Sequence, residues 1–331
     1  MHPFTYHRVD NLHDATTAAD AGGAVVLAGG TELVNWMRLG LSRPTDVVDI
    51  NRLPDLSAID LVDGTVHIGA LTRLNDVAGH PLVRDRFPVL TQAIHQAASA
   101  QLRNLATIGG NPLQLTRCPY FRSETPTPCN KRRPGSGCAA RHGISDQHAI
   151  FGWTDDCVAV QPADPATALA ALDAVLVTES ARGGRRIPAR DLHVLPSQDP
   201  AAHHVLRPDE IVTRIEIPGT ARRSAYVKVR ERASYEYAIV AAAVALEFDG
   251  TTIRGARIAL GSVAMRPWRL DRSEQLLIGS TVGSTEAEAA VTAGFADARP
   301  LPHNAHKIPL ARNAVLRAIE QAAAGAPAAR P

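Results

Sequence analysis

Hydrophobic positions in the first third of the chain alternate between short apolar runs and helical spacing. Three apolar runs predict strands, at residues 24–28, 47–50 and 66–70. A short helix is expected over 15–21, with Asp14 as its cap. Helical spacing returns from Leu33 to Gly40, and again between Arg86 and Ala100. The first glycine pair, Gly29-Gly30, therefore stands where a strand meets a helix.

The pattern disappears from residue 111 to about 152, where Pro, Gly and Arg become frequent. A loop this long is uncommon in a compact domain, so something other than backbone ladders must order it. Regular patterning resumes at 168–177, and further strands are expected at 211–217, 225–229, 238–248 and 253–260. Alanine-rich segments at 284–296 and 308–324 predict the final helices. A Pro-Gly pair places a domain boundary near Gly219.

Composition narrows the class of protein. A chain of 331 residues, 45% hydrophobic and 21% charged, is typical of a globular protein with about two domains. A net charge of +2 and 4% aromatic residues argue against a nucleic-acid partner. The apolar run 238–246 is far shorter than the roughly 20 residues that span a bilayer, so we expect no membrane insertion. The N-terminus lacks the apolar core of a secretory signal, which predicts a cytoplasmic start.

Two glycine turns are candidates for one ligand site. VVLAGGTELV and NLATIGGNP each combine small residues with a threonine next to a helical segment. Such turns let phosphates approach the backbone, and amide groups at a helix start favour anions. Neither spacing matches the Rossmann fingerprint or the P-loop. Taken by itself, the first segment is better explained as a plain strand-to-helix turn. Two such turns could close on one extended ligand from both sides, and this favours a site for a pyrophosphate.

All four cysteines lie within one stretch of 40 residues, with the spacing C-x10-C-x8-C-x18-C, at Cys118, Cys129, Cys138 and Cys157. Two disulfides, a zinc site and an iron–sulfur cluster are all compatible with this spacing, which ranks a metal centre above disulfides. His142 and His148 lie in the same loop and could replace a cysteine at zinc, although we expect both to be solvated loop residues.

Longer motifs resemble a known family. AGGTELV and LRNLATIGGN resemble the FAD-binding medium subunits of the molybdenum hydroxylase, or xanthine dehydrogenase, family. RCPYFR, PCNKRRPGSGCAA and QPADPATAL are similar to the aldehyde oxidoreductase type of that family, and KVRERASY and GSVAMRPWR extend the resemblance into the second half. The resemblance implies an α+β fold, with a two-lobed FAD-binding domain over 1–219, a loop insertion at about 112–157, and a C-terminal domain of antiparallel sheet and helices over 220–331.

The resemblance also implies the residues that bind FAD. The first turn would wrap the pyrophosphate with Val26, Leu27, Ala28, Gly29, Gly30, Thr31, Glu32, Leu33 and Val34. The second would complete the cradle with Thr107, Gly109, Gly110 and Asn111. Asp164 would bind the polar tail of the flavin, but Ala163 lacks the hydroxyl that the family carries there. Lys228 and Val212 would line the isoalloxazine, although a place in a core strand is an alternative for Val212.

In the aldehyde oxidoreductase type the cysteine loop holds a [4Fe-4S] cluster, so the resemblance implies that the four cysteines ligate it. Lys131, Arg132, Arg133 and Arg141 could offset its charge. Expected partners are a molybdopterin-binding large subunit, a [2Fe-2S] small subunit and an external electron acceptor. The chain lacks H-E-x-x-H, G-x-S-x-G and P-loop motifs, so no side chain is named as catalytic.

Two other functions stay open. One is a flavoprotein subunit of a 4-hydroxybenzoyl-CoA reductase-like complex, and the other is a zinc-stapled scaffold without redox chemistry. A partner with a twin-arginine signal could also carry the folded subunit to the periplasm.

Overall fold

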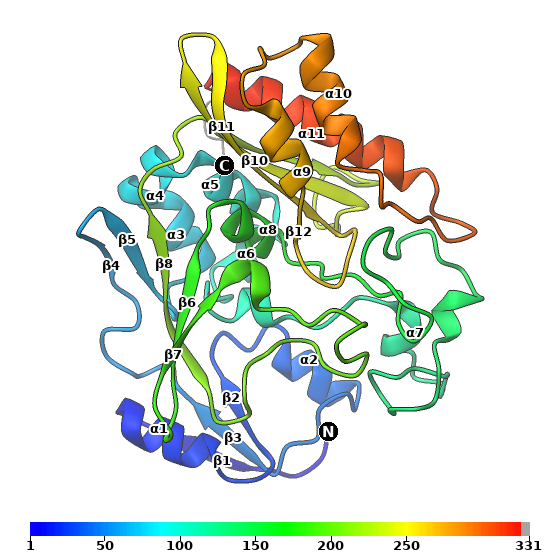
Figure 1. The fold of residues 1–331 in the computed structure, drawn as a ribbon. Helices are drawn as coiled ribbons and strands as arrows, with labels where there is room; N and C mark the ends of the chain where they lie inside the picture. Colours follow the sequence, from blue (N-terminus) through cyan, green and yellow to red (C-terminus); the bar gives the residue numbers. More distant parts are fainter. Residues whose placement is uncertain (326–331) are drawn as a thin grey trace.

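The computed structural model describes residues 1–325 and begins with a small parallel sheet (Figure 1). Strands β1 (Thr5–Arg8), β3 (Asp46–Asp49) and β2 (Ala24–Leu27) pair in that order, and helices α1 (Leu12–Ala19) and α2 (Leu33–Arg38) connect them. The expected cap and bounds of the first helix are wrong. Asn11 caps α1, because its side chain accepts the Asp14 N–H at 2.8 Å. The helix therefore begins before Asp14.

The second lobe is a five-stranded antiparallel sheet. Its order is β4 (Ile59–Val62), β5 (Thr65–Gly69), β8 (Ile211–Pro218), β6 (Val175–Glu179) and β7 (Arg185–Pro188). The lobe's helices are α3 (Leu74–Gly79), α4 (Pro81–Arg86), α5 (Pro88–Gln96), α6 (Ala100–Arg103) and α8 (Asp164–Ala171). Apolar residues of β5 and β8 share one core with α5 and α8, including Ile68, Ile215, Leu90 and Leu169.

The C-terminal domain pairs four antiparallel strands with three helices. The sheet order is β12 (Trp268–Arg269), β11 (Thr252–Gly261), β10 (Val240–Asp249) and β9 (Ser224–Val229). Helices α9 (Asp271–Leu277), α10 (Thr285–Ala293) and α11 (Lys307–Ala324) follow. The predicted α+β fold, with two lobes and a C-terminal antiparallel sheet, is confirmed. No helix within residues 1–325 is both long enough and apolar enough to cross a bilayer.

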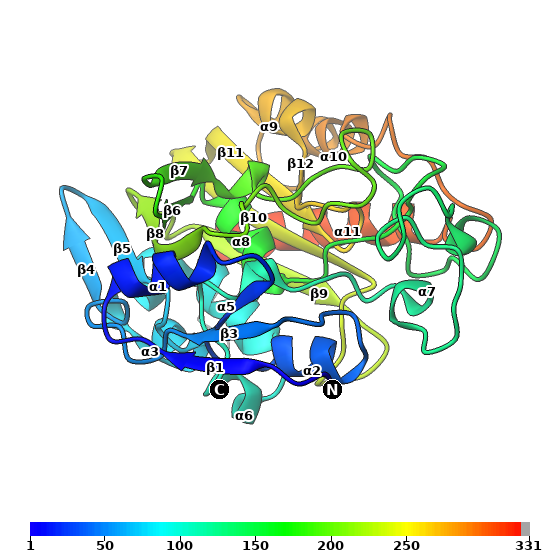
Figure 2. The same cartoon turned by 90° about the horizontal axis from the view of Figure 1, so that it is seen from below.

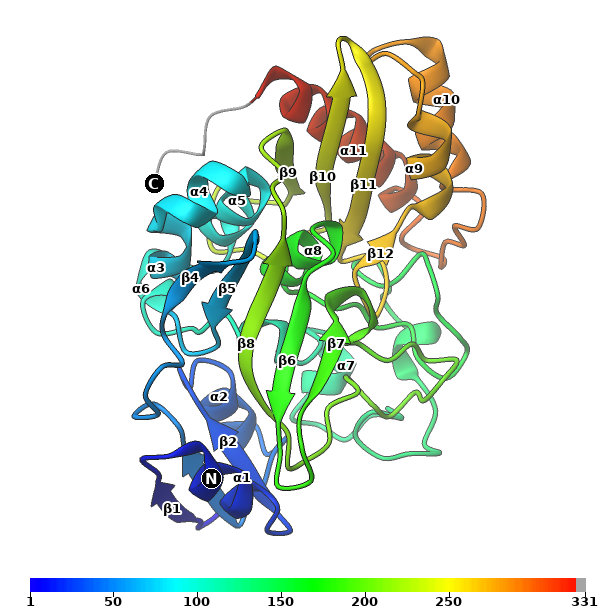
Figure 3. The same ribbon diagram turned by 60° about the vertical axis from the view of Figure 1, so that its left-hand side comes forward.

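The continuous apolar run in β10 has a simple cause. Val240, Ala242, Val244 and Leu246 belong to the core that includes α11 residues. Ala241, Ala243 and Ala245 belong instead to the core of the second lobe, with α5 and α8. Both faces of the strand are therefore buried, which removes the usual polar alternation. Figure 3 shows the two antiparallel sheets, with α8 between them.

The cysteine loop, residues 112–157, contains short elements that the sequence pattern did not predict: α7 (Pro119–Arg122) and the 3-10 turn η2 (Ala139–Arg141), after η1 (Asn111–Leu113) at its start. Residues from the C-terminal domain hold it. Lys307 Nζ donates to the carbonyls of Gln147, His148 and Ser262 at 3.2, 2.8 and 2.6 Å. Asn304 Nδ2 donates to the carbonyl of His148 at 3.0 Å. Long-range hydrogen bonds thus order a segment with little regular structure of its own.

Candidate cofactor site

The first glycine turn is packed directly against the second. Gly30 has φ 71°, a left-handed conformation that glycine adopts without steric cost. A Cβ on Gly29 would lie 2.0 Å from the carbonyl oxygen of Leu105 and 3.2 Å from Cα of Ala106. Only a residue without a side chain allows this approach, so the two turns form one continuous wall.

The second turn is shaped by its own hydrogen bonds. Thr107 Oγ1 accepts the Gly110 N–H at 3.2 Å, and the Thr107 carbonyl accepts the Asn111 N–H at 2.9 Å. Gly109 donates its N–H to the Ala70 carbonyl at 3.0 Å, and a Cβ at Gly109 would lie 2.6 Å from Cβ of Ala70. These residues hold the turn in place, which leaves the side chain of Asn111 at the edge of a cleft.

That cleft has a volume of about 320 Å³ and is bordered by both turns, α8, β9 and the loop after β9. It brings together five of the predicted FAD-binding residues: Thr31, Glu32, Asn111, Asp164 and Lys228. Two buried polar atoms on its wall, Asn111 Oδ1 and Arg117 Nε, have no hydrogen-bond partner among the described residues. Buried polar atoms are normally paired, so the cleft suits a polar cofactor such as FAD.

A buried ion pair forms one end of the cleft. Lys228 Nζ donates to Asp164 Oδ2 at 2.8 Å and to the Gln96 carbonyl at 2.9 Å, and the Tyr226 hydroxyl donates to Asp164 Oδ1 at 2.7 Å. Burial raises the pKa of Asp164, while Lys228 and Tyr226 act to lower it. With both oxygens of the carboxylate already accepting bonds, Asp164 holds the Lys228 ammonium at a fixed place on the cleft wall.

The remaining predicted residues lie outside the cleft lining. Val26 and Leu27 are in β2 and Ala28 follows it; Leu33 is buried in the core of α2; Val34 is 45% exposed. Val212 is 6% exposed and belongs to the core of the second lobe, where it pairs with Thr178 across β8 and β6. This is the position that the core-strand alternative describes, and the contact of Val212 with the flavin stays a prediction.

Three residues of the site were not predicted. Gln161 Oε1 accepts the Ala163 N–H at 2.9 Å, and its Nε2 donates to the Pro112 carbonyl at 3.1 Å, so it joins the second turn to the start of α8. The sequence feature that could have identified Gln161 is its position two residues before Ala163, beside the predicted Asp164. Arg117 lies over the ring of Tyr237, with 4.4 Å from the guanidinium carbon to the ring centre, and both line the cleft. Their separation of 120 residues gave no local signal.

The four cysteines line one small cavity, of about 10 Å³, beside Tyr120, Phe121, Asn130 and Lys131. Cys118 is the N-cap residue of α7. The backbones of Cys129 and Cys138 pair as an isolated antiparallel β-bridge, and those of Thr154 and Cys157 form another. All four are free thiols. Burial raises the pKa of Cys118 to about 12 and also raises the pKa of Cys157. Four thiols that line one cavity are a donor set that suits a metal–sulfur centre, which would stabilise their deprotonated forms. Residues 1–325 contain no group of three or more His, Cys, Asp or Glu side chains placed around a single metal ion.

Two basic residues of the loop contact this cavity or its cysteines. The Lys131 ammonium donates to the Ala202 carbonyl at 2.6 Å, and burial lowers its pKa. His148 Nε2 lies 3.3 Å from Cys118 Sγ, and burial lowers the pKa of His148 to about 4. The expectation that His148 is solvated is therefore wrong, because Asn304 and Lys307 of the C-terminal domain cover its segment. His142 is exposed, as predicted.

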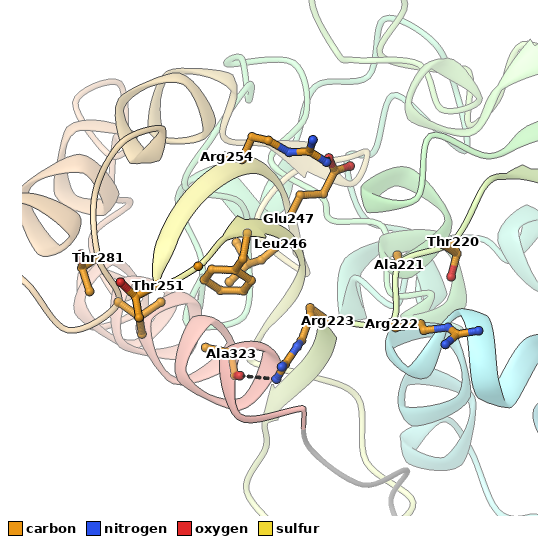
Figure 4. Close-up of a pocket in the computed structure, with 13 residues that line it drawn as sticks. Thr220, Ala221, Arg222, Arg223, Leu246, Glu247, Thr251, Arg254, Thr281 and Ala323 are labelled. Carbon is orange, nitrogen blue, oxygen red and sulfur yellow. Dashed lines mark hydrogen bonds and ion pairs between the residues drawn. The ribbon is translucent and has the colours of Figure 1, made fainter.

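A second cleft, of about 630 Å³, lies in the C-terminal domain and contains none of the predicted site residues (Figure 4). Arg223 Nη1 donates to the Ala323 carbonyl at 2.6 Å, and Arg254 pairs with Glu247 at 3.1 Å. Two of its three arginines are thus engaged within the protein.

Fold and site together define an FAD-binding subunit of the molybdenum hydroxylase class of oxidoreductases, and comparison with known proteins agrees. Residues 2–220 match the FAD-binding domain of molybdopterin dehydrogenases, and residues 225–322 match the C-terminal domain of CO dehydrogenase flavoproteins. The chain belongs to this family of FAD-binding medium subunits, which form part of multi-subunit complexes.

Individual relatives cover almost the whole chain. It is 41% identical to the aldehyde oxidoreductase FAD-binding subunit PaoB of Escherichia coli, over 98% of this chain and all of that one. It is 28% identical to the carbon monoxide dehydrogenase medium chain of Hydrogenophaga pseudoflava, over 90% and 88% of the two chains. A solved structure of carbon monoxide dehydrogenase from that organism superposes with a TM-score of 0.76 at 27% identity, covering 98% of this chain and 99% of that chain.

Proposed function

We propose that this subunit carries electrons in a molybdenum-containing aldehyde oxidoreductase. Electrons would arrive from [2Fe-2S] clusters on a small partner, reach FAD in the cleft and leave to an external acceptor, with a [4Fe-4S] cluster in the cysteine loop. The observation that carries this proposal is that four free thiols line one cavity next to the FAD cleft. The aldehyde oxidoreductase name of the 41% identical relative supports the substrate class.

The two sites are separated by very little chain. Arg117 lines the FAD cleft, and the next residue, Cys118, lines the cysteine cavity. When bound, FAD exchanges electron pairs or single electrons, and an iron–sulfur cluster exchanges single electrons. Around them the chain supplies position and charge: Asp164 and Tyr226 fix the Lys228 ammonium in the cleft, and Lys131 places a cation beside the thiols. No side chain is assigned as an acid, a base or a nucleophile.

The proposal includes a heterotrimer with a molybdopterin-binding large subunit and a [2Fe-2S] small subunit. Localisation follows from those partners: the subunit stays in the cytoplasm unless a partner with a twin-arginine signal exports it already folded. Co-expression with each partner, followed by cell fractionation, tests this point. Recovery of this chain in the periplasm when it is expressed alone would contradict it.

Metal analysis tests the cluster directly. Purified wild-type chain should contain FAD and about four iron atoms per molecule. The Cys129→Ser variant should lose the iron and become more sensitive to proteolysis within 112–157, because the thiolates jointly hold that segment. His142→Ala, a change at an exposed residue of the same loop, should leave both unchanged. A colourless protein that contains zinc without iron or flavin would favour the zinc-stapled scaffold instead.

A 4-hydroxybenzoyl-CoA reductase-like complex would use the same cofactors, so metal analysis does not separate it. The assembled complex should reduce an artificial acceptor in the presence of an aromatic aldehyde. Reduction of an aromatic acyl-CoA thioester by the same complex, without turnover of aldehyde, would replace the proposed reaction with this alternative.

A further inference from the structure

Glu32 connects the first glycine turn to the cysteine loop. It stands at the start of α2, and its carboxylate accepts the indole N–H of Trp36 at 2.9 Å from the same helix. The carboxylate also accepts from two arginines that lie 85 and 90 residues further along the chain. These are Arg117 and Arg122, the latter through Nη2 at 3.2 Å. Figure 2 shows α2 and α7, which Arg122 ends, on the same side of the molecule.

The two arginines bracket Cys118. Arg117 precedes it, and Arg122 closes the helix that Cys118 caps. Arg122 Nε donates to the Thr116 carbonyl at 2.8 Å and Nη2 donates to the Leu115 carbonyl at 3.2 Å, so the guanidinium also holds the segment that leads into Cys118. The side chain of Arg122 is 12% exposed and that of Glu32 21%. The contact is therefore well shielded from water, and one carboxylate keeps two neighbouring cations in place.

The same carboxylate positions a wall of the FAD cleft. Glu32 and Arg117 both line the cleft, and Arg117 is held between the carboxylate and the ring of Tyr237. Loss of order around Arg117 or Arg122 changes the surroundings of Glu32, because both guanidinium groups contact its carboxylate. The cleft and the loop consequently share Glu32, and both of its ion pairs require that the segment around Cys118 is ordered.

We propose that Glu32 is a positioning residue that couples FAD binding to the order of the cysteine loop. FAD strengthens the folded loop, and the filled loop strengthens the binding of FAD by the same factor, because linkage between two sites is reciprocal. The inference rests on the proposed function for the identity of the loop's occupant, a [4Fe-4S] cluster. The contact between Glu32 and the loop arginines does not depend on that identity.

A double-mutant cycle on the dissociation constant of FAD tests the coupling. Cys129→Ser should weaken FAD binding by about five- to tenfold in the wild-type background. In the Glu32→Gln background the same change should have almost no further effect, since the connection is already broken. A Glu32 with a purely local structural role would give additive losses, and additivity would overturn the proposal.

Glu236→Gln is the matched control. Glu236 lines the same cleft, and its carboxylate pairs with Arg232 at 3.1 Å. The effect of Cys129→Ser on FAD binding should persist in the Glu236→Gln background, and its disappearance there would contradict a specific role for Glu32. Where Glu32→Gln does not fold by circular dichroism, the double variant Arg117→Gln with Arg122→Gln removes both contacts of Glu32 from the loop side and completes the cycle.

A second readout separates this inference from the proposed cluster. Addition of FAD to wild-type chain should slow proteolysis within 112–157, and should not slow it in Glu32→Gln. Wild-type protein without iron that still shows this FAD-dependent protection would refute the cluster and keep the coupling. If the protein contains iron but FAD does not slow proteolysis of its loop, the coupling is refuted and the cluster is retained.

Discussion

Replacement of Gly29 by alanine should separate the two glycine turns and weaken FAD binding. The added Cβ would stand 2.0 Å from the Leu105 carbonyl oxygen and 2.8 Å from the carbonyl carbon. Relief to ordinary contact requires a shift of more than about 1 Å in a backbone that also carries Thr107 and Asn111. An overpacked site of this kind costs about 2 kcal/mol, which is roughly a thirtyfold loss in affinity for a ligand bound by both turns.

Two other glycines calibrate this loss. Gly22→Ala is the control, because its Cβ would meet no atom within 4 Å. Gly30→Ala should have an intermediate effect, since its Cβ would lie 3.3 Å from Leu27 Cδ1 and the cost comes from the left-handed φ of 71°, about 1 kcal/mol. Fluorescence titration gives the dissociation constant of FAD, and thermal melts by circular dichroism report folding. A folded Gly29→Ala variant that binds FAD as tightly as Gly22→Ala would refute the packed-turn reasoning.

Three further predictions concern buried charges. Lys307→Met should lower the free energy of unfolding in urea by about 3 kcal/mol, since three carbonyls lose a hydrogen bond and, within residues 1–325, only that of His148 keeps another, from Asn304. Arg312→Met on the exposed side of the same helix should not lower it. Burial raises the pKa of Glu210, but hydrogen bonds from Arg185, the Arg207 N–H and Thr178 outweigh it and set the pKa to about 2. Glu210 should therefore contribute about 3 kcal/mol to the free energy of unfolding above pH 4.5, and this contribution should disappear as the pH falls toward 2. The free energy of unfolding of Glu210→Gln, measured across the same range, should show no such loss. Lys131→Gln should lower the reduction potential of the bound cluster in an EPR-monitored titration, and Lys131→Arg should restore it; equal potentials would exclude a charge effect.

Local patterns predicted the elements with long apolar runs and missed those fixed by distant contacts. The strands at 24–27, 211–218 and 240–249 follow directly from their hydrophobic residues. The first helix was misplaced because only Asp14 was considered as its cap, whereas the Asn11 side chain accepts the Asp14 N–H and caps a helix that begins at Leu12. Helix α9 was not predicted from the sequence, because a helix this short produces only a weak periodic pattern of hydrophobic residues.

The candidate site divides in the same way. Family motifs identified Thr31, Asn111, Asp164 and Lys228, which meet in one cleft. The contacts of Glu32 with the cysteine loop could not be predicted, because 85 or more residues separate the partners. His148 was misjudged for a related reason: a loop position that is polar in sequence becomes buried once the last helix covers it.

The hydrogen bonds from Lys307 also set an order of events during synthesis. The ammonium and the Gln147 carbonyl that it holds are 160 residues apart in the chain. At about 5–20 residues per second, a ribosome needs roughly 10–30 s to make the intervening segment. For most of that interval all four cysteines have been made, while Asn304 and Lys307, which hold the loop, have not. The loop can therefore reach its final hydrogen bonding only after the first turn of the last helix has been made.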